Sequence, residues 1–385
     1  MNKKVIAHIG AVGTAFILVW SGLTLVSPNL VEYYQHHLTL EQEYQKTVVP
    51  LHQTLQSGEI VVFGSSELTK PMHFRADSFL TDRNFPVSFS GAPYRQCFSI
   101  YSKLATHYTT TIRDEARIVV ILSPRWFTRD KEGMKMQYFL EDMTIPMMYE
   151  LYINSEVDTT TKLRVSKYIE RHKCEIKPLT FVYKYALRYS KERAFESPLD
   201  GIVRQVLQTA NLSFDTSISR ISYSNQQLNY DSLKMIALQI EEQLSHNSFH
   251  VRDTFYEERK KTLNLNQQFP LALPTPFPLT DNQEYQDLLA LIELLKTYKN
   301  PPLFVLLGLN PYTYGPSREE YIRPLYDSIS ELLHEAHFGV VDFWAKDTAD
   351  YHNGSYIDDN HPGEVYWVQL DSALVEYFGK KEDIK

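Results

Sequence analysis

The chain has 385 residues, 43% of them hydrophobic and 22% charged, which is an ordinary composition for a globular protein. Its formal net charge of −8 argues against general nucleic-acid binding and against attraction of the whole surface to a polyphosphate polymer. An anionic polymer would therefore have to bind at a local basic patch.

The N-terminal segment has the pattern of a membrane anchor. Lys3 and Lys4 precede the mainly apolar run Val5–Val26, and about 20 apolar residues span a bilayer as a helix. Lysines before such a run place the N-terminus in the cytoplasm. A cleaved signal peptide is the alternative, but the run is long for one and no convincing Ala-x-Ala-like site follows. We predict a cytoplasmic N-terminus and transmembrane anchor over residues 1–27, a polar stalk over 28–58 and an extracytoplasmic domain over 59–385.

The stretch after the stalk has the pattern of a strand followed by a functional turn. Ile60–Phe63 predicts a short buried strand that stops at Gly64, and Ser65 and Ser66 follow. In an open α/β sheet, active groups collect beyond the carboxyl ends of strands. A serine on such a turn has an exposed hydroxyl beside backbone N–H groups, which is the setting of a nucleophile. The alternative interpretation is a turn residue or helix cap.

Further apolar runs predict the rest of the sheet. The predicted strands are Phe85–Ser88, Arg117–Leu122, Pro302–Leu307 and Val340–Phe343. Because helical patterns alternate with these runs, we expect a largely parallel sheet covered on both faces. The region from about residue 130 to 280 lacks strong strand signals and is predicted to be a helical insertion that flanks or covers the sheet.

Near the C-terminus, Asp358 stands three positions before His361. A serine near one end and Asp-x-x-His near the other is the order found in the SGNH (GDSL) hydrolase superfamily. The segment Phe63–Leu68 resembles that superfamily's Phe-Gly-Asp-Ser-Leu block, with Ser65 in place of its aspartate. The resemblance implies a three-layer SGNH-like fold and aligns Ser66 with the nucleophile.

The variant Gly-Ser-Ser-Glu-Leu, after an N-terminal membrane helix, is similar to the DltD family, which functions in teichoic acid D-alanylation. The segment Ile121–Phe127 resembles that family's Ser-Pro-x-Trp-Phe block. The closing Asp358-x-x-His361-x-Gly363 with Trp367 resembles its terminal block. These motifs are spread over the whole chain.

The resemblance implies a catalytic triad of Ser66, His361 and Asp358. His361 would take the hydroxyl proton of Ser66, since an unperturbed histidine pKa of about 6.5 suits a base at neutral pH. Asp358 would hold the imidazole tautomer and stabilise the imidazolium. Asp359 is the rival for this orienting role, on proximity alone.

The oxyanion donors are harder to assign. SGNH enzymes use a glycine after the second strand, for which Gly91 is the match, although a glycine there also suits a plain turn. They usually add an asparagine after the third strand, but this chain has Ser123-Pro124-Arg125-Trp126 there. Oxyanion or substrate-binding candidates are therefore Gly91, Trp126, Arg125 and Asn310, although Asn310 also suits a turn cap. Losing one donor costs roughly 2.7–4 kcal/mol of barrier, so we expect a slow hydrolase or one completed by a partner.

A basic patch is a further expectation. Arg125 with Arg75, His73 and Lys70 would meet phosphates near the site, and solvated surface charge is the alternative. No dinucleotide or P-loop fingerprint and no paired Cys-x-x-Cys accompanies Cys97 or Cys174. We therefore predict neither a cofactor nor a metal.

By resemblance, the function is a membrane-anchored extracytoplasmic acyl transfer of D-alanine to lipoteichoic acid. The implied partners are a membrane acyltransferase of the MBOAT type (DltB) and a carrier protein (DltC). One alternative is an SGNH-type esterase or O-acetyltransferase that acts on another cell-surface polysaccharide. The other is a non-catalytic scaffold of the D-alanylation machinery.

Overall fold

The computed structural model describes residues 42–129, 131–176, 181–192, 228–262, 273, 278–346, 348–349 and 351–379. All the elements discussed below, from the first strand onward, belong to the unit formed by Leu51–Phe195 and Phe214–Lys385. The helix α2 (Val49–Ser57) leads into this first strand.

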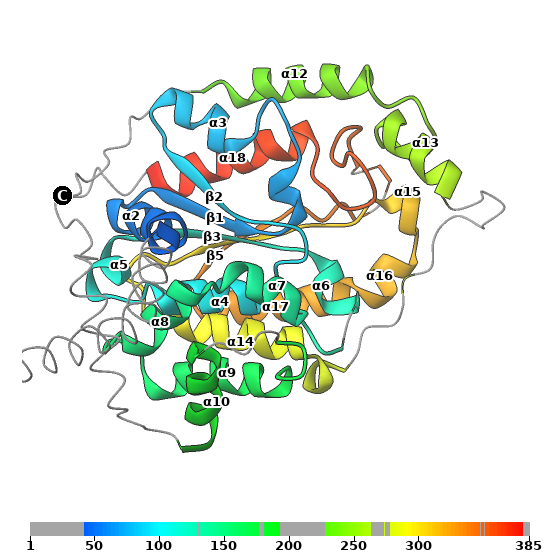
Figure 1. The fold of residues 1–385 in the computed structure, drawn as a ribbon. Helices are drawn as coiled ribbons and strands as arrows, with labels where there is room; N and C mark the ends of the chain where they lie inside the picture. The colour runs from blue at the N-terminus through cyan, green and yellow to red at the C-terminus, as the bar shows by residue number, and fades with distance from the viewer. Residues whose placement is uncertain are drawn as a thin grey trace, which may run out of the picture. The chain divides into compact units, whose positions relative to one another are not determined.

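A five-stranded parallel sheet is the centre of this unit, with the order β2-β1-β3-β4-β5 (Figure 1). The strands are β1 (Ile60–Gly64), β2 (Val87–Gly91), β3 (Arg117–Leu122), β4 (Leu303–Leu306) and β5 (Gly339–Asp342). The prediction of an α/β fold with a parallel sheet is therefore confirmed. The chain winds outward in two directions from β1 and β3, and in such sheets ligands bind beyond the carboxyl ends of the strands at this switch point.

Helices cover both faces of the sheet (Figure 1). One face carries α3 (Ala76–Phe79) and α18 (Glu364–Gly379), and the other carries α4 (Cys97–Thr106), α14 (Gln283–Leu295) and α17 (Arg323–Glu335). Alternate strand residues such as Ile60, Val62 and Val119 pack with α18 in one buried apolar cluster. Neighbouring residues such as Val61 and Phe63 are equally buried but point to the opposite face, because strand side chains alternate.

Shorter helices connect these layers. They are η1 (Ser66–Thr69), η2 (Thr81–Arg83), α5 (Thr110–Glu115), α6 (Pro124–Arg129), η3 (Leu279–Asp281), α15 (Pro311–Tyr314) and α16 (Ser317–Tyr321). Of these, η1 follows β1 and α6 follows β3, so both begin at the carboxyl edge of the sheet, at its switch point.

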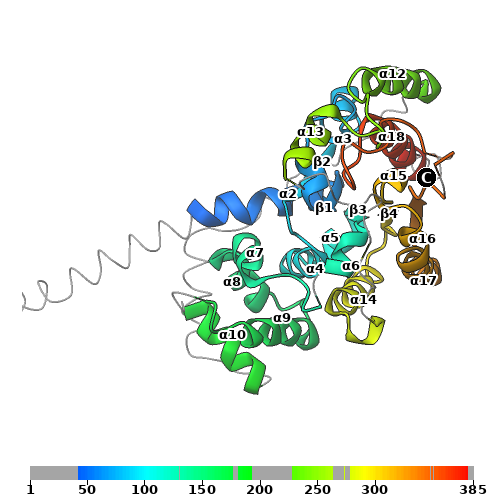
Figure 2. The same cartoon turned by 90° about the vertical axis from the view of Figure 1, so that its right-hand side faces the viewer.

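Between β3 and β4, the described residues of the predicted insertion form helices and no strand. These helices are α7 (Met136–Asp142), α8 (Ile145–Ile153), α9 (Thr159–Arg171), α10 (Phe181–Glu192), α12 (Tyr230–Glu242) and α13 (Asp253–Thr262). Figures 1 and 2 place α9 and α10 on the side of α14, whereas α12 and α13 lie on the side of α18. The region between β3 and β4 thus contributes helices to both sides of the sheet.

The predicted anchor over Val5–Val26 lies outside the described residues, as does the first part of the predicted stalk. Within the part of the chain that the structure describes, no helix is both long and apolar enough to cross a membrane. Cys97 is buried and Cys174 is exposed, and both are free thiols.

Candidate active site

The turn after β1 is fixed by a buried carboxylate. Ser65, at the end of the strand, donates its backbone N–H to Oε1 of Glu67 at 2.5 Å. Glu67 is 3% exposed, and burial raises the pKa of its carboxyl group above the usual value despite hydrogen bonds from backbone N–H groups and the nearby His361. A Cβ atom on Gly64 would lie 2.5 Å from the same Oε1. A larger residue at position 64 would therefore displace the Glu67 carboxylate from its contact with Ser65.

The two adjacent serines have different surroundings. The Ser65 hydroxyl is buried and donates to the carbonyl oxygen of Ala92 at 3.3 Å. Ser66 begins η1 and is only partly buried, and its Oγ lies 2.7 Å from Nε2 of His361. The geometry therefore distinguishes Ser66 as the serine that faces a base.

The loop before α18 carries the other two members of the predicted triad. Nδ1 of His361 lies 2.5 Å from Oδ2 of Asp358. Oδ1 of the same carboxylate accepts the backbone N–H groups of Asn360 at 2.9 Å and His361 at 2.7 Å. Since a carboxylate only accepts hydrogen bonds, Nδ1 must carry the proton, which leaves Nε2 free to accept the Ser66 hydroxyl.

The charge state of Asp358 follows from these contacts. Burial by itself would raise the pKa of this carboxyl group, but the hydrogen bond and charge of His361, with the two backbone donors, lower the pKa below its usual value. Asp358 is therefore ionised at neutral pH, as a group that stabilises an imidazolium must be.

Asp359, the rival orienting residue, belongs to a different contact group. Its Oδ2 accepts a hydrogen bond from Nη1 of Arg125 at 2.6 Å and another from the Tyr314 hydroxyl. The same Arg125 nitrogen donates to Tyr314 at 2.7 Å. The structure thus brings Asp358, and not Asp359, to the imidazole of His361. No pattern in the sequence indicated that Tyr314 would contact Asp359.

The candidate oxyanion donors differ in their availability. Gly91 pairs with Gly64 across β1 and β2, where a Cβ would lie 2.3 Å from the Gly64 carbonyl oxygen. Trp126 is 6% exposed in α6. Asn310 is fully buried and caps α15, where its Oδ1 accepts from Tyr312 and Thr313 while its Nδ2 donates to Phe249 and Tyr351. Asn310 therefore has the capping role that the sequence left open.

The predicted basic patch is largely paired with acids. Arg75 forms an ion pair with Asp77, and Nδ1 of His73 lies 3.0 Å from Oε1 of Glu364. Arg125 is paired with Asp359, although 39% of its side chain is exposed. Among the described residues, no three His, Cys, Asp or Glu side chains gather in a set that would hold a metal ion.

The fold and this geometry define an α/β protein in which Ser66, His361 and Asp358 are in hydrogen-bond contact beside the switch point of a parallel sheet. A family model described as DltD protein matches residues 37–379, so the chain belongs to the DltD family. Membership links the chain to the D-alanylation system of that family. No curated protein matches the chain.

Proposed function

We propose that the chain is a serine-dependent acyl-transfer protein that carries D-alanine through Ser66 to lipoteichoic acid. The observation that carries the proposal is the Ser66 Oγ to His361 Nε2 contact of 2.7 Å, with Asp358 behind the ring. Family membership supplies the acyl group and the acceptor. The proposal includes an SGNH-type fold, in agreement with the serine-turn and Asp-x-x-His blocks of the sequence.

The reaction has two balanced steps. In the first, Ser66 Oγ attacks the carbonyl carbon of a D-alanyl thioester while His361 takes the hydroxyl proton. The C–S bond breaks, His361 returns the proton to the leaving thiolate, and an acyl-serine remains. In the second, an acceptor hydroxyl gives its proton to His361 and attacks the acyl-serine. The ester bond to Ser66 breaks, and Ser66 Oγ recovers the proton.

Oxyanion stabilisation is the weak part of this site. The side-chain amide of Asn310 is occupied by contacts within the protein. Arg125 is paired with Asp359 and Trp126 is largely buried, so the proposal assigns the donor role to the backbone N–H of Gly91. Because one donor is worth roughly 2.7–4 kcal/mol, both steps are expected to be slow unless a partner protein completes the site.

The test is covalent labelling at Ser66. A serine-directed fluorophosphonate, and separately a D-alanyl thioester, should add their mass to the peptide that contains Ser66. Ser66→Ala should remain unlabelled, and Ser65→Ala is the matched control that should still be labelled. His361→Ala should slow the labelling. It should also leave any acyl-serine that does form longer-lived, because no base activates the acceptor.

Each outcome has a definite meaning. Labelling of Ser65 in place of Ser66 would show that Ser65, and not Ser66, is the nucleophile of the motif. No labelling, with cell-surface D-alanylation retained in Ser66→Ala, would favour the scaffold alternative. Acyl transfer from other esters but not from D-alanyl donors would favour an esterase or O-acetyltransferase of another polysaccharide.

Membrane anchoring is also part of the proposal and rests on Lys3, Lys4 and the apolar run Val5–Val26. Protease added to intact protoplasts should digest the domain beyond Pro28 and leave the preceding fragment in the membrane. The proposed partners are a membrane acyltransferase of the MBOAT type and an upstream carrier protein, consistent with the Dlt system. A protected C-terminal domain would contradict both the location and the acceptor.

A further inference from the structure

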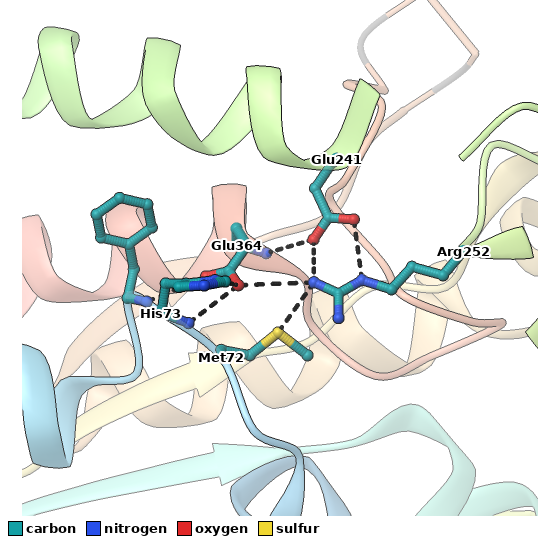
Figure 3. A network of polar contacts seen from close by, with 6 residues as sticks. Met72, His73, Glu241, Arg252 and Glu364 are labelled. Atoms are coloured by element: carbon teal, nitrogen blue, oxygen red, sulfur yellow. Dashed lines mark hydrogen bonds and ion pairs between the residues drawn. The ribbon is translucent and has the colours of Figure 1, made fainter. Parts of the chain in front are cut away.

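Figure 3 shows a network of polar contacts around Glu364, which stands three positions after His361 in the chain. Three of its members form a cluster of charged side chains: Arg252, which precedes α13, Glu241 near the end of α12, and Glu364 at the start of α18. The side chains of Glu241 and Glu364 are 0% and 1% exposed. Nη2 of Arg252 lies 2.6 Å from Oε1 of Glu241 and 3.6 Å from Oε1 of Glu364, and Nε donates to Oε2 of Glu241 at 3.1 Å. One guanidinium is therefore shared by two buried carboxylates.

The cluster joins the two segments that carry the proposed relay. Glu364 closely follows His361 in the chain, and its carboxylate accepts the backbone N–H groups of His73 and Phe74, both at 3.0 Å. His73 and Phe74 belong to the segment that leads away from Ser66. The carboxylate of Glu364 thus ties the chain after the histidine directly to the chain after the serine.

Backbone contacts extend the cluster into the histidine loop. The N–H of Arg252 donates to the carbonyl oxygen of Ile357 at 3.0 Å, and the N–H of Ile357 donates to the carbonyl oxygen of His361 at 3.0 Å. The N–H of Glu364 donates to Oε1 of Glu241 at 3.2 Å. A Cβ on Gly354, whose φ is +85°, would lie 2.2 Å from Cγ of Glu241. Arg252 and Glu241 therefore contact the loop on both sides of its histidine.

This loop has little regular structure of its own. The described stretch from Tyr351 to Gly363 contains no helix or strand, apart from an isolated bridge between Tyr356 and Pro362. The shape of such a stretch depends on groups outside it. Without Arg252, the buried carboxylates of Glu241 and Glu364 would lose the cation they share, and only the exposed ring of His73 would remain beside Glu364. The loop and the start of α18 would then have to move to separate or hydrate the two carboxylates.

We propose that Arg252 and Glu241 are positioning residues that hold the His361 loop against the segment after Ser66 and so set the Ser66–His361 distance. The expected effect on the rate at Ser66 rests on the proposed function, whereas the expected effect on the Ser66–His361 distance does not. A mutation far from the chemistry that misplaces the reacting groups by about 1 Å can cost about 10²-fold in rate. A small movement of this loop should therefore be measurable at Ser66.

The variants are Arg252→Met, Arg252→Lys and Glu241→Gln, each compared with the wild-type chain. Arg323→Met is the matched control, because Arg323 also pairs with two carboxylates, Asp327 at 2.7 Å and Asp342 at 2.8 Å. Its side chain is 29% exposed, compared with 20% for Arg252. The measurements are crystal structures, thermal unfolding midpoints, and the rate constant and affinity of fluorophosphonate labelling at Ser66.

In Arg252→Met we expect the Ser66 Oγ to His361 Nε2 distance to exceed hydrogen-bond range. The labelling rate constant should fall by about 10²-fold at unchanged probe affinity. Arg252→Lys should restore part of the rate, since lysine keeps the charge but not the forked geometry. Arg323→Met should lower the unfolding midpoint but label at the wild-type rate.

Retention of the wild-type Ser66–His361 distance in Arg252→Met would overturn the inference, as would an equal loss of labelling in Arg323→Met. If Arg252→Met does not fold, Glu241→Gln decides, because it keeps the side-chain shape and removes one charge. It should slow labelling by about tenfold, and an unchanged distance and rate would overturn the inference. A wild-type chain that resists the probe would contradict the proposed function, while the crystallographic distance would still test the positioning role.

Discussion

The two segments that meet at the Ser66–His361 hydrogen bond are held in place in different ways. Ser66 follows β1, a strand whose residues are all buried and which pairs with β2 on one side and β3 on the other. His361 lies between β5 and α18, in a stretch whose described residues from Tyr351 onward form no helix or strand. The serine is therefore placed by the sheet, and the histidine is placed by side chains from other parts of the chain.

Because the two segments are held differently, substitutions beside Ser66 and substitutions beside His361 should change different measured quantities. A change on the serine side disturbs paired strands in the core, so its cost should appear in global stability. A change on the histidine side disturbs contacts such as Arg252 with Ile357, which lie outside the sheet. Its cost should appear first in the rate of Ser66 modification. Substitutions on the two sides should therefore separate the loss of stability from the loss of labelling rate.

The largest expected effect is the difference between substitutions of two neighbouring acids in the histidine loop, Asp358 and Asp359. Asp358→Asn should lower the labelling rate of Ser66 by up to about 10⁴-fold, because an amide favours the wrong imidazole tautomer. Asp359→Asn should cost at most about tenfold, because its remaining oxygen still accepts from Arg125 and Tyr314. The measurement is the labelling rate constant of each purified variant. Equal losses, or a larger loss at Asp359, would reverse the assignment of the orienting acid.

Two glycines, Gly91 on the serine side and Gly363 on the histidine side, allow the same substitution to be compared on both sides. A Cβ on Gly91 would lie 2.3 Å from the Gly64 carbonyl oxygen, and a Cβ on Gly363 would lie 2.2 Å from the Gly354 carbonyl oxygen. Gly91→Ala should lower the free energy of unfolding by about 1–3 kcal/mol, because β1 and β2 must separate. Gly363→Ala should have a smaller effect on stability but should slow Ser66 labelling by about tenfold or more.

Urea unfolding and the labelling rate of each glycine variant give the two quantities. The comparison would be wrong if Gly363→Ala lost as much stability as Gly91→Ala and kept the wild-type labelling rate. In that case the histidine loop would be part of the cooperative core rather than a separately held segment.

The sheet and the contacts within each motif could be predicted from sequence, because their signals are local. Buried runs such as Ile60–Phe63 predicted strands, and the Asp358-x-x-His361 spacing predicted a pair that the structure brings into contact. The second predicted strand, Phe85–Ser88, is observed as Val87–Gly91, because Pro86 precedes the first residue that pairs with β1.

Apart from the Ser66–His361 contact, which the family resemblance implied, the contacts between distant segments could not be predicted. Asp358 and Asp359 are adjacent in sequence, and only the fold shows that Arg125 and Tyr314 donate hydrogen bonds to Asp359. Glu241 lies in α12 and Arg252 lies just before α13. Neither residue belongs to a motif, so nothing in the sequence indicated contact with the loop of His361. Glu67 is part of the serine motif, but its burial depends on the packing of the whole sheet edge.

The smallest expected effect concerns Glu67, the buried acid on the serine side. Burial raises the pKa of its carboxyl group, whereas the contacts of His361 lower the pKa of Asp358 on the other side. The unfolded pKa of a glutamate is about 4.3. Above that pH the folded chain binds more protons at Glu67 than the unfolded chain does. The contribution of Glu67 to stability therefore falls as pH rises towards its folded pKa.

Glu67→Gln should remove this dependence. Its amide oxygen can still accept the Ser65 N–H, so labelling of Ser66 should stay within a few-fold of wild type. Its stability relative to wild type should rise with pH, measured by urea unfolding at intervals from about pH 5 to pH 8. Glu293→Gln is the control, because the Glu293 side chain is 71% exposed. Its stability relative to wild type should stay nearly constant from about pH 5 to pH 8. If the stability difference between Glu67→Gln and wild type is equally independent of pH, the turn that holds Ser66 does not contain an acid whose pKa is raised by burial.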